Sequence, residues 1–322
     1  MTKVGLAGLG YWGPNLARNF DELAELAWLC EPDEERRARF AERYPEARAT
    51  GSFDEMLADP ELDAVAVATP VPTHHELAKR ALEAGKHVFV EKPPAMRAAE
   101  MDELVALAAA RRLVLMPGHL LLYHPGVQKL KELIRSGELG DVLCIYGNRQ
   151  NLGIVRTNEN ALWSLGVHDL SVILYLLDEE PAEAVAHGRD FLTQGVEDVV
   201  FCYLRFPSGK IAHMHLSWLD PHKMRRITVV GREKMAVFDD MELERKVTVY
   251  EKAPWKQVET YGEWQTRSGD IWIPKVATDE PLRLECSHFL ALLEGNGDRA
   301  KVAQDGAMVV RTLEKLTDSL RG

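Results

Sequence analysis

Three closely spaced glycines near the start of the chain limit its fold more than any other feature. They lie between an apolar, strand-like segment and a segment with the pattern of a helix. In such a strand–turn–helix the first glycine allows a tight turn, the second lets a phosphate approach the backbone, and the third lets helix and strand pack closely. The motif therefore predicts a dinucleotide bound at the helix N-terminus. The residues of this turn that we expect to contact it are Gly8, Gly10, Tyr11, Trp12 and Gly13.

Short apolar segments alternate with longer amphipathic ones through the first 118 residues. This alternation is typical of βαβ units, in which helices connect neighbouring parallel strands. The predicted strands are residues 4–7, 26–30, 64–68, 87–90 and 113–116, and the predicted helices are residues 14–23, 34–43, 53–58, 75–84 and 98–111.

The pattern changes after Gly118 to strands of alternating polarity joined by short turns. Such strands favour a mainly antiparallel sheet with helices on one face. We therefore predict an α/β chain of two domains, with a Rossmann domain of parallel strands in residues 1–118 and a second α/β domain in residues 119–322. The predicted strands of the second domain begin near residue 142 and include 199–205, 211–218, 224–231 and 246–250, and its helices are 127–135, 168–177, 281–293 and 306–320.

Composition excludes several other classes of protein. The net charge of -11 would repel nucleic acid. The longest stretch without a charged residue, residues 113–128, is too short and too interrupted by proline to span a bilayer. The four cysteines lack C-x-x-C spacing, which favours reduced thiols in a cytoplasmic protein. His213 and His215 share one face of a strand, but no third ligand is identifiable, so we expect no metal.

Glu31 follows the second predicted strand, 23 residues after Gly8. A carboxylate at this position can accept hydrogen bonds from the adenosine ribose and repel a 2′-phosphate, which favours NAD over NADP. Arg36 and Arg37 are the alternative, because a guanidinium there could neutralise such a phosphate.

Lys92 follows the predicted strand 87–90 within the sequence Glu91-Lys92-Pro93-Pro94. Ligands of open α/β sheets bind at the carboxyl ends of the strands, so Lys92 is placed to hydrogen-bond a substrate hydroxyl. The alternative is a surface ion pair between Lys92 and Glu91.

Several motifs of the first domain, in this order, are similar to those of the Gfo/Idh/MocA oxidoreductases, a family named after glucose–fructose oxidoreductase and inositol dehydrogenase. They are the glycine turn, Ala68-Thr69-Pro70 followed by His74, and Glu91-Lys92-Pro93.

This resemblance implies that Lys92, with Glu91 beside it, contacts both the substrate and the nicotinamide. It also implies that Thr69, Pro70 and His74 line the cofactor cleft. The second domain of the family is an open-faced antiparallel sheet that often serves oligomerisation, which implies a homodimer or homotetramer.

His168 stands at the start of a predicted helix, where a histidine can act as a general base near neutral pH. The alternative is a helix cap or surface residue, since the chain has 11 histidines. The segment from Trp163 to Asp169 resembles the part of the family that contains the catalytic histidine, which implies that role for His168. Many relatives have an aspartate four residues before it, and this chain has Ser164. We expect Asp169 to be a carboxylate at the helix N-terminus.

Polar and basic side chains between residues 148 and 168 suit sugar hydroxyls and phosphate oxygens. The alternative is a flexible polar loop anchored by a buried tryptophan. This run, with residues 11–15 and 118–125, resembles a subgroup of the family that acts on nucleotide-linked sugars, the UDP-N-acetylglucosamine 3-dehydrogenases. The substrate-binding residues that we expect are Tyr123, Asn148, Arg149, Asn151, Arg156, Asn160, Trp163, Ser164 and His168.

The resemblance implies an NAD-dependent dehydrogenase that oxidises the C3 hydroxyl of UDP-N-acetylglucosamine to a ketone, which an aminotransferase can convert to a 3-amino sugar. His168 would accept the hydroxyl proton, and Lys92 would polarise the oxygen. Alternatives within the family are a dehydrogenase or ketoreductase for the uronate of this nucleotide sugar, for a free sugar or for a polyol. An alternative of another class is a non-catalytic NAD-binding sensor, which would need neither Lys92 nor His168.

Overall fold

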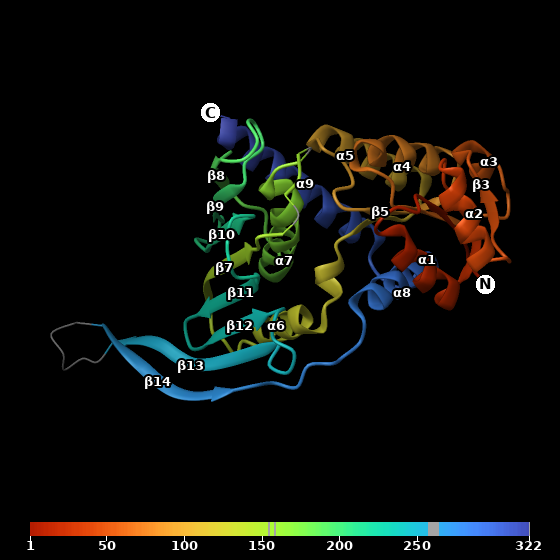
Figure 1. The fold of residues 1–322 in the computed structure, drawn as a ribbon. Coiled ribbons are helices and arrows are strands. Elements are labelled where there is room, and N and C mark those ends of the chain that lie inside the picture. The colour runs from red at the N-terminus through yellow and green to blue at the C-terminus, as the bar shows by residue number, and fades with distance from the viewer. Residues whose placement is uncertain (154, 158, 257–263, 322) are drawn as a thin grey trace. The chain divides into compact units, whose positions relative to one another are not determined.

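Two β-sheets organise the chain in the computed structural model, one in each of two units (Figure 1). Residues 1–120 and 279–311 form the first unit, and residues 121–278 and 312–322 form the second. The structure describes residues 1–153, 155–157, 159–256 and 264–321. Helix α8 (Pro281–Leu293) and the first part of α9 (Arg299–Arg321) lie in the first unit, although the sequence pattern assigns them to the second domain.

The first unit is built from strands and helices in alternation. Its strands are β1 (Lys3–Ala7), β2 (Glu25–Cys30), β3 (Arg48–Thr50), β4 (Ala64–Val67), β5 (His87–Glu91) and β6 (Leu115–Gly118), and the connecting helices are α1 (Gly13–Leu23), α2 (Glu34–Arg43), α3 (Phe53–Leu57), η1 (Val71–Thr73), α4 (His74–Glu83) and α5 (Ala98–Arg111). The strands are all parallel, in the order β3-β2-β1-β4-β5-β6, which confirms the predicted Rossmann fold. The order reverses between β1 and β4, and ligands of such sheets bind beyond the carboxyl ends of the strands at this reversal.

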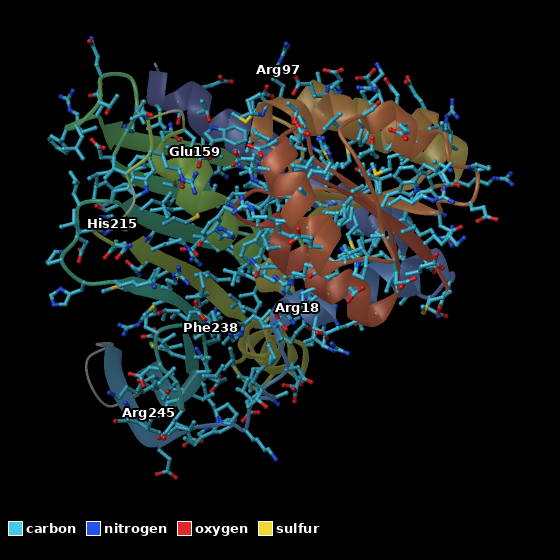
Figure 2. The ribbon with its side chains drawn as sticks, turned by 45° about the vertical axis from the view of Figure 1, so that its right-hand side comes forward. Arg18, Arg97, Glu159, His215, Phe238 and Arg245 are labelled. Carbon is cyan, nitrogen blue, oxygen red and sulfur yellow. The ribbon has the colours of Figure 1, made fainter. Side chains whose placement is uncertain are left out.

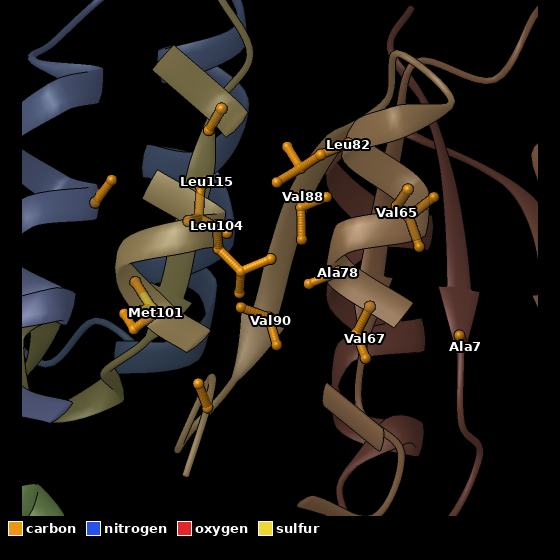
Figure 3. Close-up of a cluster of buried hydrophobic side chains, with 14 of the residues drawn as sticks. Ala7, Val65, Val67, Ala78, Leu82, Val88, Val90, Met101, Leu104 and Leu115 are labelled. Carbon is orange, nitrogen blue, oxygen red and sulfur yellow. The ribbon is translucent and has the colours of Figure 1, made fainter. Parts of the chain in front are cut away.

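The core on one side of this sheet lies under helices α4 and α5 (Figure 3). Val65 of β4 and Val88 of β5 belong to one buried cluster with Ala78 and Leu82 of α4 and Met101 of α5, and none of the five has exposed surface. Because helices cover both faces of the central strands, β4 is a continuous apolar run rather than an alternating one. This packing holds the carboxyl ends of β4 and β5 in place.

The second unit contains a larger sheet of mixed direction. Its strands among the described residues are β7 (Val142–Gln150), β8 (Glu183–Arg189), β9 (Val199–Arg205), β10 (Ile211–Ser217), β11 (Met224–Gly231), β12 (Met235–Asp239), β13 (Val247–Lys256) and β14 (Trp264–Trp272), and its helices are η2 (from Leu120 to Tyr123), α6 (Pro125–Arg135), η3 (Leu162–Gly166) and α7 (Val167–Leu177). The order is β14-β13-β12-β11-β7-β10-β9-β8. Among the described strands of this second sheet only β7 and β10 pair in parallel, which confirms a mainly antiparallel sheet. The sequence pattern did not predict β8, β12 or β14.

The two faces of this second sheet differ in character. Along β10, Ala212 and Met214 are buried, whereas His213 and His215 point to the other face. Phe238 of β12 lies on the covered face beside α6. Figure 2 shows Phe238 toward the helices and His215 on the opposite side of the sheet. Helix α6 packs on the Phe238 face, and Figure 1 shows α7 on the same side of the sheet, whereas among the described residues of this unit it shows no helix over the His215 face. We call the latter the open face.

In the described part of the chain, no helix combines the length and apolar character needed to cross a membrane. The four cysteines are buried and form no disulfide.

Candidate active site

The glycine turn between β1 and α1 leaves no room for side chains at two of its three glycines. Gly8 has a φ of +92°, and a Cβ there would lie 2.6 Å from the Ala68 backbone oxygen. A Cβ on Gly13 would lie 2.1 Å from the Gly8 backbone oxygen. Gly10 differs, because a Cβ there would meet no atom within 4 Å. Gly8 and Gly13 are therefore required by the packing of the turn, and Gly10 leaves its backbone open to a bound group.

Helix α1 presents an uncompensated N-terminus at this turn. It begins at Gly13 with Pro14 in its first turn, no side chain caps it, and its first turn contains no acidic residue. Its N–H groups and the positive end of its dipole therefore favour an anion. An open glycine backbone beside such a helix end fits the pyrophosphate of a dinucleotide. The Tyr11 side chain is 90% exposed at this turn, and Trp12 is half-buried.

Glu31 ties the end of β2 to the glycine turn. Its Oε2 accepts a hydrogen bond from the Leu9 N–H at 2.8 Å, and its Oε1 accepts one from the Asp33 N–H at 3.2 Å. Arg36 Nη1 lies 3.3 Å from Oε2, and Arg37 donates to the Glu31 backbone oxygen at 2.7 Å. Both arginines are thus engaged with Glu31 or its backbone, and a carboxylate at this position suits the ribose hydroxyls of NAD.

His74 joins the segments that follow β4 and β5. Its buried ring has Nδ1 2.8 Å from the Pro93 backbone oxygen and Nε2 2.7 Å from the Thr69 backbone oxygen. Burial lowers the pKa of His74, and the hydrogen bonds to these two carbonyls oppose the shift in part. The ring therefore holds the segment with Lys92, whose peptide bond to Pro93 is cis, against the segment with Thr69 and Pro70.

Glu91, Lys92 and His119 gather at the carboxyl ends of β5 and β6. Burial raises the pKa of Glu91 to about 7, and the neighbouring Lys92 charge opposes this rise. The Lys92 backbone N–H donates to Glu91 Oε2 at 3.2 Å. His119 follows β6, and its buried Nε2 has no hydrogen-bond partner among the described residues. Burial, and next the Lys92 charge, lower the pKa of His119 to about 4. Glu91 and Lys92 are half-buried and lie beside a buried histidine, so they differ from the surface ion pair that was the alternative for Lys92.

His119 is a site residue that the sequence analysis did not single out. Its position in the sequence could have identified it, because His119 directly follows β6 just as Lys92 directly follows β5.

His168 lies in the first turn of α7, directly after the π-helical segment η3. Its side chain is half-buried, and its backbone oxygen accepts a hydrogen bond from the Ser171 hydroxyl at 2.8 Å. Ser164, four residues earlier, lies within η3 and is also half-buried. Single π-helical turns are rare and occur frequently at functional sites.

Asp169 and Arg149 form a buried ion pair between α7 and β7. Arg149 Nε and Nη2 each lie 2.7 Å from Asp169 Oδ1, and the side chains are 9% and 1% exposed. A Cβ on Gly147 would lie 3.3 Å from Asp169 Oδ2, so this glycine makes room for the carboxylate. Burial raises the pKa of Asp169, and the Arg149 charge opposes the rise. Asp169 is therefore an ion-pair partner as well as a carboxylate at the start of a helix.

Asn148 and Arg149 are neighbours in sequence but lie on opposite faces of β7. Asn148 is on the open face, where Gln150 Nε2 lies 3.5 Å from its Oδ1 and 2.7 Å from His215 Nδ1. Arg149 is on the covered face with Asp169. The structure therefore does not bring Asn148 and Arg149 together, and their substrate-binding roles remain predictions.

Asn160 and Trp163 have structural contacts of their own. Asn160 Oδ1 accepts the Trp163 backbone N–H at 3.1 Å, and Trp163 Nε1 donates to Thr317 Oγ1 at 2.9 Å. The buried Trp163 thus anchors η3 to the end of α9. The other residues expected to contact substrate lie on separate segments: Tyr123 in η2, Asn151 after β7, and Arg156 before η3, where its Nε is 2.9 Å from Glu159.

Comparison with known protein families identifies both domains of the chain. Residues 2–119 match the NAD-binding Rossmann fold of the Gfo/Idh/MocA oxidoreductase family, and residues 127–237 match the C-terminal domain of the same family. The chain belongs to the Gfo/Idh/MocA family. It is accordingly an oxidoreductase of CH–OH groups with NAD as cofactor, as predicted.

Individual relatives of the family carry different names. The UDP-N-acetylglucosamine 3-dehydrogenase of Acidithiobacillus ferrooxidans is 29% identical over 238 residues, 74% of each chain. Its solved structure has a TM-score of 0.83 at 25% identity, covering 99% of this chain and 97% of that one. The 2,7-anhydro-N-acetylneuraminate hydratase of Escherichia coli is 30% identical over 230 residues, which are 66% of this chain and 60% of that protein. GenD2 from gentamicin A biosynthesis, solved in complex with NAD, has a TM-score of 0.83 at 25% identity, covering 99% of this chain and 94% of that one.

The different surroundings of Gly10 and Gly13 predict different effects of replacing each glycine by alanine. Gly10→Ala adds a methyl group in open space, so we expect an unchanged melting temperature and NAD affinity at least about tenfold weaker, or roughly 1.4 kcal/mol. Gly13→Ala collides with the Gly8 backbone, so we expect it to lower both. Calorimetric NAD titration and thermal unfolding measure the two effects. Full NAD affinity in a folded Gly10→Ala variant would contradict this assignment.

His119 predicts a specific loss of stability in acid. Its pKa is about 4 in the folded chain against 6.5 for an ordinary histidine, so the unfolded chain binds more protons between these values. Stability should therefore fall as pH drops from about 6.5 to about 4, by about 3 kcal/mol from this residue. His119→Asn should lack this part of the decline when urea unfolding is compared across that pH range. An identical pH dependence in wild type and variant would show that His119 does not titrate as described.

Proposed function

We propose that the chain is an NAD-dependent dehydrogenase that oxidises the C3 hydroxyl of a nucleotide sugar, with UDP-N-acetylglucosamine as the substrate. The observation that supports this most strongly is the structural similarity, over 99% of the chain, to a UDP-N-acetylglucosamine 3-dehydrogenase. The two residues that the chemistry needs, Lys92 and His168, are both present. The product would be a 3-keto nucleotide sugar, which is a suitable substrate for an aminotransferase.

The proposed chemistry needs the cofactor and two side chains. NAD, when bound, accepts the hydride that leaves the carbon. Lys92 donates a hydrogen bond to the C3 oxygen and stabilises the negative charge that develops there. His168 accepts the hydroxyl proton. Because Ser164 replaces the aspartate found in many relatives, the proposed proton transfer relies on Lys92 and His168 alone.

Arg156 supplies charge for the diphosphate of the proposed substrate. Its side chain is 47% exposed, and its Nε lies 2.9 Å from the carboxylate of Glu159, three residues later in the chain. Because the guanidinium is open to solvent, this pair contributes little stability, so the guanidinium can exchange Glu159 for a diphosphate at small cost. Arg149, by contrast, already contacts the Asp169 carboxylate through two of its nitrogens.

Absorbance of reduced nicotinamide tests the proposal directly. Purified protein and NAD are mixed with UDP-N-acetylglucosamine, its uronate, free N-acetylglucosamine or a polyol, in the presence of an aminotransferase that removes the ketone. We expect NADH only with UDP-N-acetylglucosamine. NADH with the polyol alone would favour the alternative within the family, and bound NAD that no sugar reduces would favour the sensor.

Lys92→Ala should lower kcat at least about 100-fold because the developing oxyanion loses its donor, while NAD affinity stays within a few-fold. Lys79→Ala is the matched control, since Lys79 is a lysine of the same unit that pairs with Glu103 at the surface. The control should keep wild-type turnover. Wild-type turnover in Lys92→Ala would refute the assigned role.

We further propose that the open face is where two copies of the chain associate. Tyr146 stacks on His213 at 4.5 Å between ring centroids, and Phe201 stacks on His215 at 4.4 Å. Phe201 is nevertheless 53% exposed and Tyr203, on the same strand, is 40% exposed. A band of exposed aromatic rings on an uncovered sheet is typical of a protein–protein interface.

Light scattering coupled to gel filtration tests this association. Wild type should elute as a dimer or tetramer, and the double variant Phe201→Arg, Tyr203→Arg should elute as a monomer, because it places two charges in the proposed apolar interface. Leu243→Arg, at a residue that is 88% exposed outside this face, is the control and should leave the assembly intact. A monomeric wild type would disprove the interface.

A further inference from the structure

Helix α8 carries a buried carboxyl group that the proposed reaction does not use. Glu285 has no exposed surface, and neither of its carboxyl oxygens has a hydrogen-bond partner among the described residues. The buried Lys86 and Lys131 differ from it, because each donates to two backbone oxygens. An unpaired buried carboxylate is costly, so Glu285 must be neutral or must share its charge with a nearby group.

The packing of α8 directs Glu285 toward the end of β5. Phe289, one helical turn after Glu285, has its ring centroid 5.7 Å from that of Phe89 on β5. Glu91 is two residues after Phe89, so both side chains leave the sheet on the same face. Glu285 lies on the same side of α8 as Phe289 and therefore faces Glu91. A Cβ on Gly118 of β6 would lie 3.1 Å from the Phe89 ring and 3.2 Å from Glu91 Oε1, which places those two side chains over one position of β6.

Contacts with α1 hold α8 in this position. Arg18 pairs with Glu280, and Arg283 pairs with Glu22, so ion pairs join the two helices at two points. Between them, the Phe20 ring of α1 packs edge-on against Phe89 and Phe289, each at 6.1 Å. Glu285 is thus part of a well-packed layer and cannot turn away to solvent.

The two carboxyl groups influence each other's ionisation. Burial, and next the charge of Glu91, raise the pKa of Glu285 well above its ordinary value. The pKa of Glu91 is raised only to about 7, because Lys92 opposes the effect of burial. Glu285, which has no positive neighbour to oppose this rise, is therefore the member that keeps its proton, and Glu91 loses its proton around neutral pH. The other ionisable groups near the pair among the described residues include His74 of α4, His119 after β6, Cys286 and Glu280 of the α8 region, and Arg18 of α1.

We propose that Glu285 and Glu91 form a carboxyl pair that holds one proton, so that a single negative charge faces Lys92 at the active site. Glu285 is then a positioning residue, because its neutral form allows Glu91 to stay ionised beside the Lys92 ammonium. Loss of the Glu285 proton in alkaline solution adds a second buried charge, which draws that ammonium away from the substrate oxygen. This inference rests on the proposed role of Lys92.

The pH–rate profile of Glu285→Gln tests the pair. Glutamine matches the neutral acid in size and cannot ionise, so we expect a rate within about threefold of wild type at neutral pH. Between neutral pH and about pH 9, wild type should lose at least about fivefold more of its activity than the variant. Glu294→Gln, at an exposed position at the end of the same helix, is the control and should follow wild type. The same alkaline decline in Glu285→Gln as in wild type would overturn the proposal.

Infrared spectroscopy tests the pair without any sugar substrate. Wild type and Glu294→Gln at slightly alkaline pH should show the carbonyl band of a protonated carboxyl group, and Glu285→Gln should lack it. Absence of the band in wild type would overturn the pair whatever the substrate. Presence of the band in a protein that no sugar can turn over would support the pair and refute the proposed function instead.

Discussion

The cofactor site depends on the close approach of two backbone segments where the first sheet reverses its strand order. Gly8 comes directly after β1, and its backbone lies so close to that of Ala68, directly after β4, that no side chain fits between them. Because these strands are neighbours, the glycine turn, Glu31 after β2, Thr69 after β4 and Lys92 after β5 lie along one edge of one sheet. Glu31 and His74 then fix that edge, the former through the Leu9 N–H and the latter through two carbonyl groups.

In the second unit the corresponding constraint is the ion pair between Arg149 and Asp169. Both side chains are nearly free of solvent, so removal of either would leave a buried charge without its partner. Asp169 adjoins His168, and the pair therefore fixes the first turn of α7, which carries the proposed base. Gly147 permits this arrangement, because it lets the carboxylate rest against β7.

Local patterns of the sequence predicted the parts of the fold and site that depend on local geometry. The glycine turn, the alternation of strands and helices, and the positions of Glu31 and Lys92 after their strands all follow from spacing. The run from Asn148 to Arg156 was harder to interpret, because polar residues in a strand divide between two faces and Arg149 finds its partner twenty residues away. The sequence also cannot tell which core an amphipathic helix covers, so α8 and the whole of α9 were assigned to the second domain, although α8 and the first part of α9 lie in the first unit. The sequence analysis did not single out Glu285 and His119 for a related reason, since an ionisable residue in a helix or turn is usually exposed and only tertiary packing buries it.

Deuterium transfer tests the central claim, oxidation at C3 of a nucleotide sugar, most directly. UDP-N-acetylglucosamine carrying deuterium at C3 is incubated with the protein and NAD, and the reduced nicotinamide is analysed by mass spectrometry. The account predicts one deuterium in each NADH formed, because the hydride leaves C3. NADH without deuterium would place the oxidation at another carbon and contradict the account, as would the absence of NADH from a protein that binds both molecules.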